Sequence, residues 1–313
     1  MKIAKPKFWD QKKSLISLFL FPISFLFQIF LKIRKITTNQ KSFNTPIICV
    51  GNIYLGGTGK TPLVIEIAKE LEILGKKSAI IKKFYPDHFD EHSLIRNQVK
   101  SLFLDKSRIK AISKADSNSF DFLILDDGFQ DHSIKRDLNI LCFNSKQLLG
   151  NGMTLPSGPL RENLNAIKRS DIVLINGKKN KSFENKILSI SKKIKIFYSK
   201  YVLNEADKLK NKNILAFAGI GNPNNFFELL EDNNVNIKKK LIFPDHYNYN
   251  KVEIQNIMED SLKDDLKVVT TEKDYLRIKD YGHKNLIVAK VKLIIENKDN
   301  FINEIMNIDA KKN

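Results

Sequence analysis

The chain carries a glycine-rich segment, residues 51–61, whose residue types suit the binding of a phosphate chain. It follows an apolar run and precedes an amphipathic pattern, so it connects a strand to a helix. Its glycines let backbone N–H groups curl around phosphates, and the helix N-terminus adds positive partial charge. Lys60 can then reach the outer phosphates, and the Thr61 hydroxyl is placed to ligate Mg²⁺. The nucleotide-binding candidates are Gly56, Gly57, Thr58, Gly59, Lys60 and Thr61.

The spacing of this segment differs in one place from the strict pattern G-x-x-x-x-G-K-[ST], because the first glycine would fall at Tyr54. An ordinary glycine-rich turn between a strand and a helix is the alternative interpretation. The density of glycines and the adjacent Lys-Thr pair favour a phosphate-binding loop, and they predict ATP as its ligand.

Two adjacent carboxylates, Asp126 and Asp127, follow an apolar strand that we expect over residues 122–125. Carboxylates at the C-terminal end of such a strand are placed like a Walker B site that holds Mg²⁺. An isolated Asp-Asp-Gly sequence is also common in simple turns. Since this one comes about 65 residues after the phosphate loop, we interpret the two motifs as parts of one metal–nucleotide site.

A third segment, residues 150–162, is rich in glycine and proline and is predicted to be a loop. It ends in Arg161 and Glu162. The arginine could clamp a phosphate, and the glutamate could tune the metal site. Spacing alone favours the alternative of a plain surface loop.

The N-terminal part contains an uncharged stretch, residues 14–31, with lysine or arginine on both sides. As a helix it would be about 27 Å long, just short of a bilayer core of about 30 Å. Its polar residues Ser14, Ser17, Ser24 and Gln28 fall close to one stripe, which favours a helix lying in the membrane interface. Trp9 would suit the interfacial belt. A buried core helix is the alternative, whereas a secretory signal lacks its cleavage site.

From residue 46 onward, short β-rich runs alternate with helical patterns. This alternation predicts an α/β fold with largely parallel sheets. A second unit begins near residue 213, with a helix opening at Asn222-Pro223 and a turn at residues 271–274. The Lys- and Asn-rich stretch 178–212 is predicted to hold the connection between the units.

The composition bounds the possible partners. The net charge of +18 suggests an anionic partner, such as nucleic acid, an anionic membrane face or a phosphorylated substrate. Only seven of the 53 basic residues are arginine, which disfavours base recognition, and we predict no nucleic-acid partner. Cys49 and Cys142 lie in apolar runs, as expected of core residues in a reducing compartment.

The order of the motifs resembles that of the tetraacyldisaccharide 4′-kinase family. The similar pieces are V-G-N…G-G-T-G-K-T-P, D-D-G-F-Q, G-N-G…L-P-S-G-P-L-R-E, A-G-I-G-N-P…F-F, F-P-D-H and T-E-K-D, and they extend over nearly the whole chain. The resemblance implies phosphorylation by ATP of the 4′-hydroxyl of a tetraacyl glucosamine disaccharide 1-phosphate, a step of lipid A synthesis at the inner membrane. It also implies two α/β domains with the active site in the cleft between them.

The resemblance also implies site residues outside the phosphate loop. Asp90 and Glu91 match an acidic pair of the family, and His246 matches the histidine of its P-D-H piece. We expect Asp90 to act as a base paired with His246, and Glu91 to join Thr61, Asp126 and Asp127 as a metal ligand. With Asp90 and His246, the catalytic candidates are Lys60, Gln130, Arg161 and Glu162.

The chain departs from the family pattern in the segment that precedes this acidic pair. Residues 82–86, Lys-Lys-Phe-Tyr-Pro, stand in place of the family's S-R-G-Y-G. His92 replaces a proline, and Asp131 sits where many members have histidine. These departures concern the contacts to the acceptor more than the ATP site.

Together these observations predict a P-loop NTPase-like parallel-sheet domain, a second smaller α/β domain and an N-terminal membrane-associated helix. The expected bounds are 1–36 for the membrane-anchor helix, 37–205 for the kinase domain and 206–313 for the C-terminal domain that closes the cleft. The expected partners are the membrane glycolipid and the anionic inner-membrane surface, on its cytoplasmic face. No obligate protein partner is inferred. A membrane-bound P-loop ATPase without a lipid acceptor is the alternative function.

Overall fold

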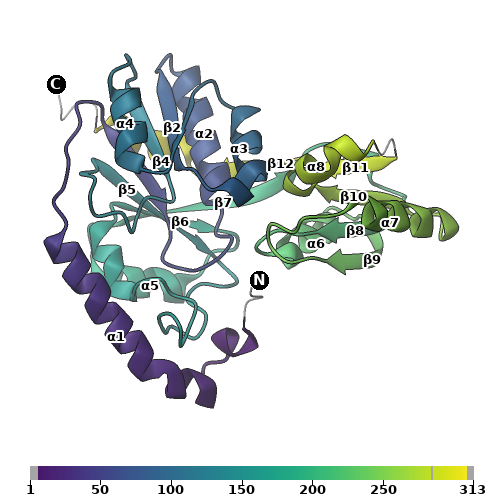
Figure 1. Cartoon of the computed structure of the whole chain (residues 1–313), viewed down its shortest axis with the longest axis horizontal. Helices are drawn as coiled ribbons and strands as arrows, with labels where there is room; N and C mark the ends of the chain where they lie inside the picture. Colours follow the sequence, from purple (N-terminus) through teal and green to yellow (C-terminus); the bar gives the residue numbers. More distant parts are fainter. Residues whose placement is uncertain (1–5, 283–284, 309–313) are drawn as a thin grey trace. The chain divides into compact units, whose positions relative to one another are not determined.

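The computed structural model describes residues 6–282 and 285–308 (Figure 1). Its helices longer than one turn are α1 (Leu15–Thr37), α2 (Lys60–Ile73), α3 (Phe89–Arg96), α4 (Arg108–Asp116), α5 (Lys181–Ile190), α6 (Pro223–Asp232), α7 (Lys251–Lys263), α8 (Glu272–Ile278) and α9 (Lys298–Met306). Its strands are β1 (Ile47–Gly51), β2 (Ser78–Lys83), β3 (Leu102–Asp105), β4 (Phe122–Asp126), β5 (Leu138–Asn144), β6 (Ile172–Asn176), β7 (Lys195–Leu203), β8 (Asn213–Ala218), β9 (Asn236–Ile242), β10 (Lys267–Thr271), β11 (Leu286–Ala289) and β12 (Val291–Ile295).

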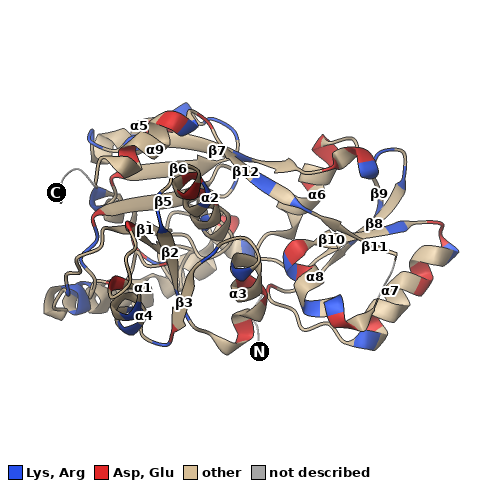
Figure 2. Ribbon diagram, turned by 90° about the horizontal axis from the view of Figure 1, so that it is seen from above, with Lys and Arg blue, Asp and Glu red and all other residues tan. Residues whose placement is uncertain are grey.

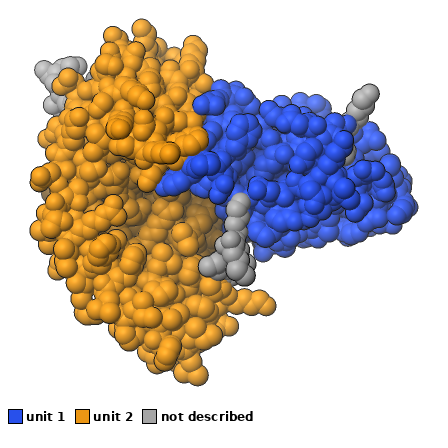
Figure 3. All heavy atoms as spheres, viewed as in Figure 1, with its two compact units in different colours: residues 1–4, 85–98, 201–293 blue, residues 5–84, 99–200, 294–313 orange. Residues whose placement is uncertain are grey.

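The chain divides into two compact units, each with its own sheet (Figure 3). The larger unit holds residues 6–84, 99–200 and 294–308, and the smaller unit holds 85–98 and 201–293 apart from the undescribed pair 283–284. The polypeptide therefore passes between the units several times. These units do not follow the linear bounds 1–36, 37–205 and 206–313, because compactness depends on contacts between distant segments. Of those ranges, residues 1–5, 283–284 and 309–313 lie outside the described residues.

The larger unit is built on an eight-stranded sheet in the order β12-β7-β6-β5-β1-β4-β2-β3. The pairings from β7 through β3 are parallel. The strands β1 and β4 lie at its centre and are buried along their whole length, which explains their continuous apolar sequences. Because β1 and β4 are neighbours with Val50 opposite Asp126, the loop after β1 and the carboxylates after β4 meet at one edge of the sheet.

The smaller unit has a four-stranded parallel sheet in the order β11-β10-β8-β9. Alternate residues of β8 point to opposite faces, as in any strand. Ile214, Ala216 and Ala218 join a core with Phe226 and Phe227 of α6, whereas the intervening Leu215 and Phe217 pack with apolar residues of α7 and α8. Helices on both faces of the sheet therefore give this unit its own core.

The N-terminal helix α1 presents two different faces to its surroundings. Ser17 and Ser24 are buried, and Ser24 Oγ lies 2.7 Å from Ser157 Oγ and 3.0 Å from the Thr154 carbonyl oxygen. Large apolar side chains on the other face are exposed, including Leu15 and Phe19, which are more than four-fifths exposed. By length and composition α1 could also cross a membrane. The polar stripe therefore docks on the loop 151–157 and leaves an apolar face uncovered.

The expectation that Trp9 lies at a membrane interface is wrong. Trp9 is buried within the larger unit, and its Nε1 donates to the carbonyl oxygen of Pro156 at 3.0 Å. Asn151 N in turn donates to the Trp9 carbonyl oxygen at 2.8 Å. The indole thus fastens the chain before α1 to the same loop that receives Ser24.

The basic residues are spread over both units (Figure 2). Acidic residues accompany them on many elements; α7, for example, carries lysine at both ends and acidic residues between them. The excess of positive charge is nevertheless uneven along the sequence, because residues 1–35 hold eight basic residues and one acidic residue.

The stretch 178–212 holds a connection between the units, as expected, since the chain passes from the larger to the smaller unit after Lys200. It is also regular structure, because it contains α5 and β7, which pairs with β6 in the larger sheet. The turn predicted at residues 271–274 is the start of α8, where Thr271 caps the helix by accepting from Asp274 N. This expectation of a turn is wrong because polar residues that cap a helix look like loop residues in the sequence.

Candidate active site

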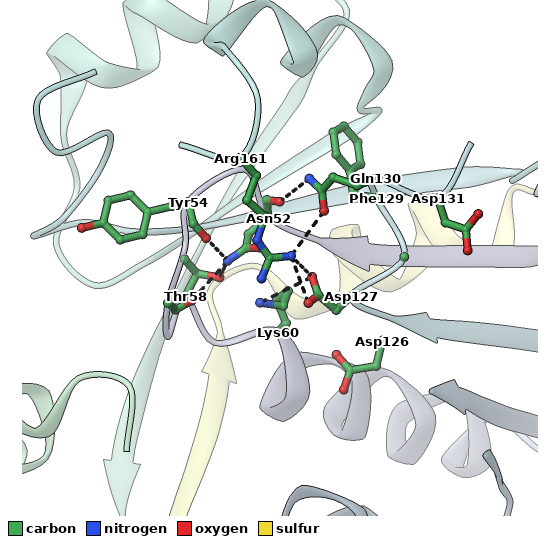
Figure 4. Close-up of polar contacts among 12 residues, drawn as sticks. Asn52, Tyr54, Thr58, Lys60, Asp126, Asp127, Phe129, Gln130, Asp131 and Arg161 are labelled. Atoms are coloured by element: carbon green, nitrogen blue, oxygen red, sulfur yellow. Dashed lines mark hydrogen bonds and ion pairs between the residues drawn. The ribbon is translucent and has the colours of Figure 1, made fainter. Parts of the chain in front are cut away.

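The loop between β1 and α2 is held in shape by the buried side chain of Asn52. Its Nδ2 donates to the carbonyl oxygens of Tyr54 and Gly56, at 2.6 and 3.2 Å, and to Thr58 Oγ1 at 3.0 Å (Figure 4). The helix begins after Gly59, whose φ of 92° favours glycine. Gly59 has no side chain to cap α2, so the first N–H groups of the helix are available to an anion.

Lys60 and Arg161 converge on Asp127 (Figure 4). Lys60 Nζ lies 3.7 Å from Asp127 Oδ1, and Arg161 Nη1 donates to both carboxylate oxygens at 2.9 and 3.0 Å. Burial alone would raise the pKa of Asp127, but the charges of Lys60 and Arg161 outweigh it and lower the pKa to about 2. The carboxylate is therefore ionised at neutral pH, next to two cations that could bind phosphate oxygens.

Asp126 forms the second half of this site. It is fully buried at the end of β4, where its Oδ2 accepts from Thr61 Oγ1 at 3.1 Å and from Lys82 Nζ at 2.5 Å. Its Oδ1 is also buried, and it has no hydrogen-bond partner among the described residues. A carboxylate oxygen without a partner beside a threonine hydroxyl at a helix start fits Mg²⁺, which keeps several waters and phosphate oxygens as ligands.

The loop 150–162 joins the other two motifs through backbone and side-chain contacts. Arg161 N donates to the Ile53 carbonyl oxygen at 2.7 Å, and Leu55 N donates to that of Pro159 at 2.8 Å. Gln130 Oε1 accepts from Arg161 Nη1 at 3.3 Å. Three motifs that are distant in the sequence are thus assembled at one edge of the larger sheet.

Glu162 is tied to residues of the same unit. Arg169 Nη2 donates to both of its carboxylate oxygens at 2.9 and 2.8 Å, and Gln130 Nε2 donates to Glu162 Oε1 at 3.2 Å. Gln130 Nε2 also donates to the Asn52 carbonyl oxygen at 2.9 Å. Glu162 and Gln130 therefore connect the phosphate loop to the loop that bears Arg161.

Close packing also fixes the strand end before the phosphate loop. A Cβ atom at Gly51 would lie 2.4 Å from the Cβ atom of Phe129 and 3.2 Å from its backbone nitrogen. Only glycine fits where these two segments touch, so Gly51 keeps the phosphate loop against the segment that follows Asp127.

The smaller unit brings Asp90 and His246 together, as expected from the sequence. Asp90 lies at the start of α3 and His246 in the loop after β9, and His246 Nδ1 is 3.1 Å from Asp90 Oδ1. Arg277 donates to the other oxygen of Asp90, and it also donates to Asp274 Oδ1 at 2.8 Å. Burial opposes ionisation of Asp90, yet its hydrogen bond with His246 and the nearby Arg277 and Lys273 hold its pKa well below the usual range.

Glu91 belongs to the same cluster of the smaller unit. Lys273 Nζ lies 2.6 Å from Glu91 Oε1, and His246 Nε2 lies 4.0 Å from that oxygen. The ring of His88 stacks on that of His246, with the centroids 4.3 Å apart. The structure thus groups Glu91 with Asp90 and His246, and it groups Thr61, Asp126 and Asp127 in the larger unit.

The sequence analysis missed several residues that complete these clusters, namely Asn52 as a support of the loop, Lys82, Arg169, Lys273, Asp274 and Arg277. A signal for the last two was present, since Asp274 and Arg277 are three residues apart on one helix and such residues are neighbours on its surface. The others come from separate elements and carry no local signal.

Residues 16–308 match the sequence model of a protein family, which is described as Tetraacyldisaccharide-1-P 4′-kinase. The chain belongs to this family. A tetraacyldisaccharide 4′-kinase from Pelagibacter ubique is 42% identical over 318 residues, covering 99% of this chain and 100% of the relative. One from Rickettsia bellii is 31% identical over 325 residues, with the same coverage.

A solved structure extends the similarity to three dimensions. LpxK from Aquifex aeolicus, crystallised in complex with ATP, superposes with a TM-score of 0.72 at 25% identity. The match covers 94% of this chain and 99% of that one. The expected P-loop NTPase-like fold, with two sheets of largely parallel strands and an N-terminal apolar helix, is therefore confirmed.

The buried pair Arg277–Asp90 gives a first testable prediction. Replacing Arg277 by Gln removes the guanidinium that donates to Asp90, and breaking a buried ion pair from one side costs about 3–5 kcal/mol. We expect a matching loss in the free energy of unfolding, measured by urea denaturation, and a partial recovery in the double variant Arg277→Gln/Asp90→Asn. Lys263→Gln, which removes an exposed ion pair on α7, is the matched control. Equal stability of Arg277→Gln and the control would contradict the prediction.

Proposed function

We propose that this chain transfers the γ-phosphoryl group of ATP to the 4′-hydroxyl of a tetraacyl glucosamine disaccharide 1-phosphate, a step of lipid A synthesis. Membership of the 4′-kinase family and the similarity to an ATP-bound LpxK support the reaction and the nucleotide. The single observation that carries the proposal is the convergence of Lys60 and Arg161 at the phosphate loop, beside the Thr61–Asp126 contact.

Each residue of this cluster has a physical role in phosphoryl transfer. Lys60 and Arg161 stabilise the negative charge on the transferred group, because they are preorganised around Asp127 and need little rearrangement. Thr61 and Asp126 are placed to hold Mg²⁺, whose chemistry when bound is to neutralise phosphate charge. Asn52 keeps the loop curled so that its N–H groups face the phosphates. Asp127 holds the two cations in place and remains available as a further ligand.

The pair Asp90–His246 is proposed to activate the acceptor hydroxyl. The lowered pKa of Asp90 keeps it ionised, so by itself it is a weak base. When His246 Nδ1 donates its hydrogen to Asp90, the lone pair of the imidazole lies on Nε2, and the carboxylate fixes this tautomer and the orientation of the ring. Nε2 can then take the proton of the hydroxyl as the phosphoryl group is transferred. Arg277 and Asp274 hold Asp90 in the orientation that this requires.

The exposed face of α1 supports a site of action at the membrane. At 100° per residue, Leu15, Phe19 and Leu26 lie within about 40° of one another on the helix surface, and Ser17 and Ser24 lie roughly opposite. The serines dock on the protein, and the apolar face remains exposed. We infer that this face enters the inner membrane from the cytoplasmic side, with Lys32, Arg34 and Lys35 near anionic headgroups.

The alternative function, a membrane-bound ATPase without a lipid acceptor, shares the phosphate loop but not the need for Asp90 and His246. The protein can be incubated with γ-labelled ATP and the tetraacyl disaccharide 1-phosphate in detergent micelles. Label in the glycolipid supports the kinase, whereas label only in free phosphate would establish the ATPase instead.

The variant Lys60→Ala is expected to lower phosphoryl transfer in this assay by at least about 10²-fold. The lysine acts on charge that develops at the transferred group, and contacts of this kind contribute most of the catalysis. Its far-ultraviolet circular dichroism should be unchanged, because Lys60 is the first residue of α2 and its ion pair with Asp127 is long, at 3.7 Å. Near-normal turnover of a folded Lys60→Ala protein would rule out this loop as the ATP site.

A double-mutant cycle tests whether Asp90 and His246 act as a unit. We expect Asp90→Asn and His246→Ala each to cut kcat by roughly 10²-fold or more, with little change in the KM for ATP. The double variant should lose far less than the product of the two single effects. Fully multiplicative losses would show independent roles, and an unchanged kcat in Asp90→Asn would remove this residue from the mechanism.

The membrane role of α1 can be tested without deleting it. Replacing Leu15, Phe19 and Leu26 by Gln removes three exposed apolar side chains while it leaves the serine contacts intact. We expect at least about tenfold weaker binding to anionic phospholipid vesicles in a sedimentation assay, because apolar burial drives interfacial binding. The double change Val252→Gln/Leu262→Gln on α7, where both residues are also exposed, should bind as the wild type does. Unchanged binding of the triple variant would refute this role for α1.

A further inference from the structure

Lys82 is a buried cation at the edge of the proposed metal site. It lies near the end of β2, directly opposite Asp126 in the parallel pairing of β2 with β4. Only 6% of the residue is exposed, and its Nζ lies 2.5 Å from Asp126 Oδ2. Burying a charged lysine destabilises the fold unless the charge is paired. This ion pair is therefore part of the interior of the site and not a surface contact.

The two oxygens of Asp126 are used differently. Oδ2 is shared by Lys82 Nζ and Thr61 Oγ1, whereas Oδ1 is buried and has no hydrogen-bond partner within the described part of the chain. The lysine therefore neutralises the carboxylate without occupying its second oxygen. That oxygen can still accept from a water of a bound metal ion.

We propose that Lys82 is a resident counter-ion of the metal site, which balances the charge of Asp126 when no metal is bound and supplements the metal when it is. The inference rests on the proposed function only for the identity of the ligands, ATP or ADP with Mg²⁺.

With Lys60, Lys82 and Arg161 set against Asp126 and Asp127, the cluster has more cations than carboxylates. It can therefore attract a polyphosphate without a divalent ion, and Lys82 also weakens Mg²⁺ binding by repulsion.

Lys82 lies on β2, whereas Lys60 and Thr61 lie at the start of α2. The contribution of Lys82 is thus separable by mutation from that of the phosphate loop.

The test measures the affinity for ADP by isothermal titration calorimetry, once with excess Mg²⁺ and once with EDTA. The quantity compared is the ratio of the two dissociation constants, EDTA over Mg²⁺. We expect Lys82→Met to raise this ratio at least about tenfold over the wild type, because a neighbouring positive charge has been lost and the metal must replace it. Lys82→Gln, which keeps a hydrogen-bond donor for Asp126, should raise it similarly and serves if Lys82→Met does not fold.

Two controls separate this effect from a general loss of charge or structure. Lys82→Arg keeps the charge and should retain the wild-type ratio, as should Lys100→Met, which removes an exposed lysine. An unchanged ratio of dissociation constants in folded Lys82→Met and Lys82→Gln overturns the counter-ion proposal. If the wild type binds ADP in that experiment, the proposed nucleotide site is still supported. Absence of ADP binding by the wild type in both conditions overturns the nucleotide site itself, and the counter-ion role with it.

Discussion

The need to pair buried charge governs both functional clusters of this protein. A carboxylate that leaves water must find cations or hydrogen-bond donors, since an isolated buried charge would unfold the region around it. Asp126 meets this need with Thr61 and Lys82, and Asp127 with Lys60 and Arg161. These partners come from the strands, helices and loops around the two carboxylates, so the charges bind those elements together at one edge of the sheet.

The same constraint recurs in the smaller unit. Asp90 is buried against His246 and Arg277, and Arg277 reaches back to the buried Asp274, which is also held by Thr271 and Gly219 N. Burial raises the pKa of Asp274, whereas the partners of Asp90 hold its pKa low. The arginine therefore lies between two carboxylates, and its charge favours the ionised form of both; burial outweighs it at Asp274 but not at Asp90. This division suits a carboxylate that orients an imidazole.

The loop 150–162 connects the N-terminal helix α1 to the phosphate loop. Its first half receives Trp9, Ser17 and Ser24, and its second half pairs with the backbone around Ile53 and Leu55 before it presents Arg161. A helix with an exposed apolar face is thereby fixed to the segment that carries Arg161. These hydrogen bonds hold a loop rich in glycine and proline in one conformation.

The sequence by itself determined the phosphate loop, the carboxylates at the end of β4 and the parallel α/β class, because each rests on the local order of a strand, a loop and a helix. It also determined the apolar N-terminal helix, which rests on an uncharged stretch of sequence. It also suggested the pairing of Asp90 with His246, but only through resemblance to a family. The tertiary structure alone decided that residues 85–98 pack with 201–293, and that the C-terminal helix α9 belongs to the larger unit. It alone placed Lys82 on Asp126 and Arg277 on Asp90. These contacts join residues 44 and 187 positions apart, and no local pattern encodes the partner of a charge at such a distance, because only burial in the folded chain makes that partner necessary.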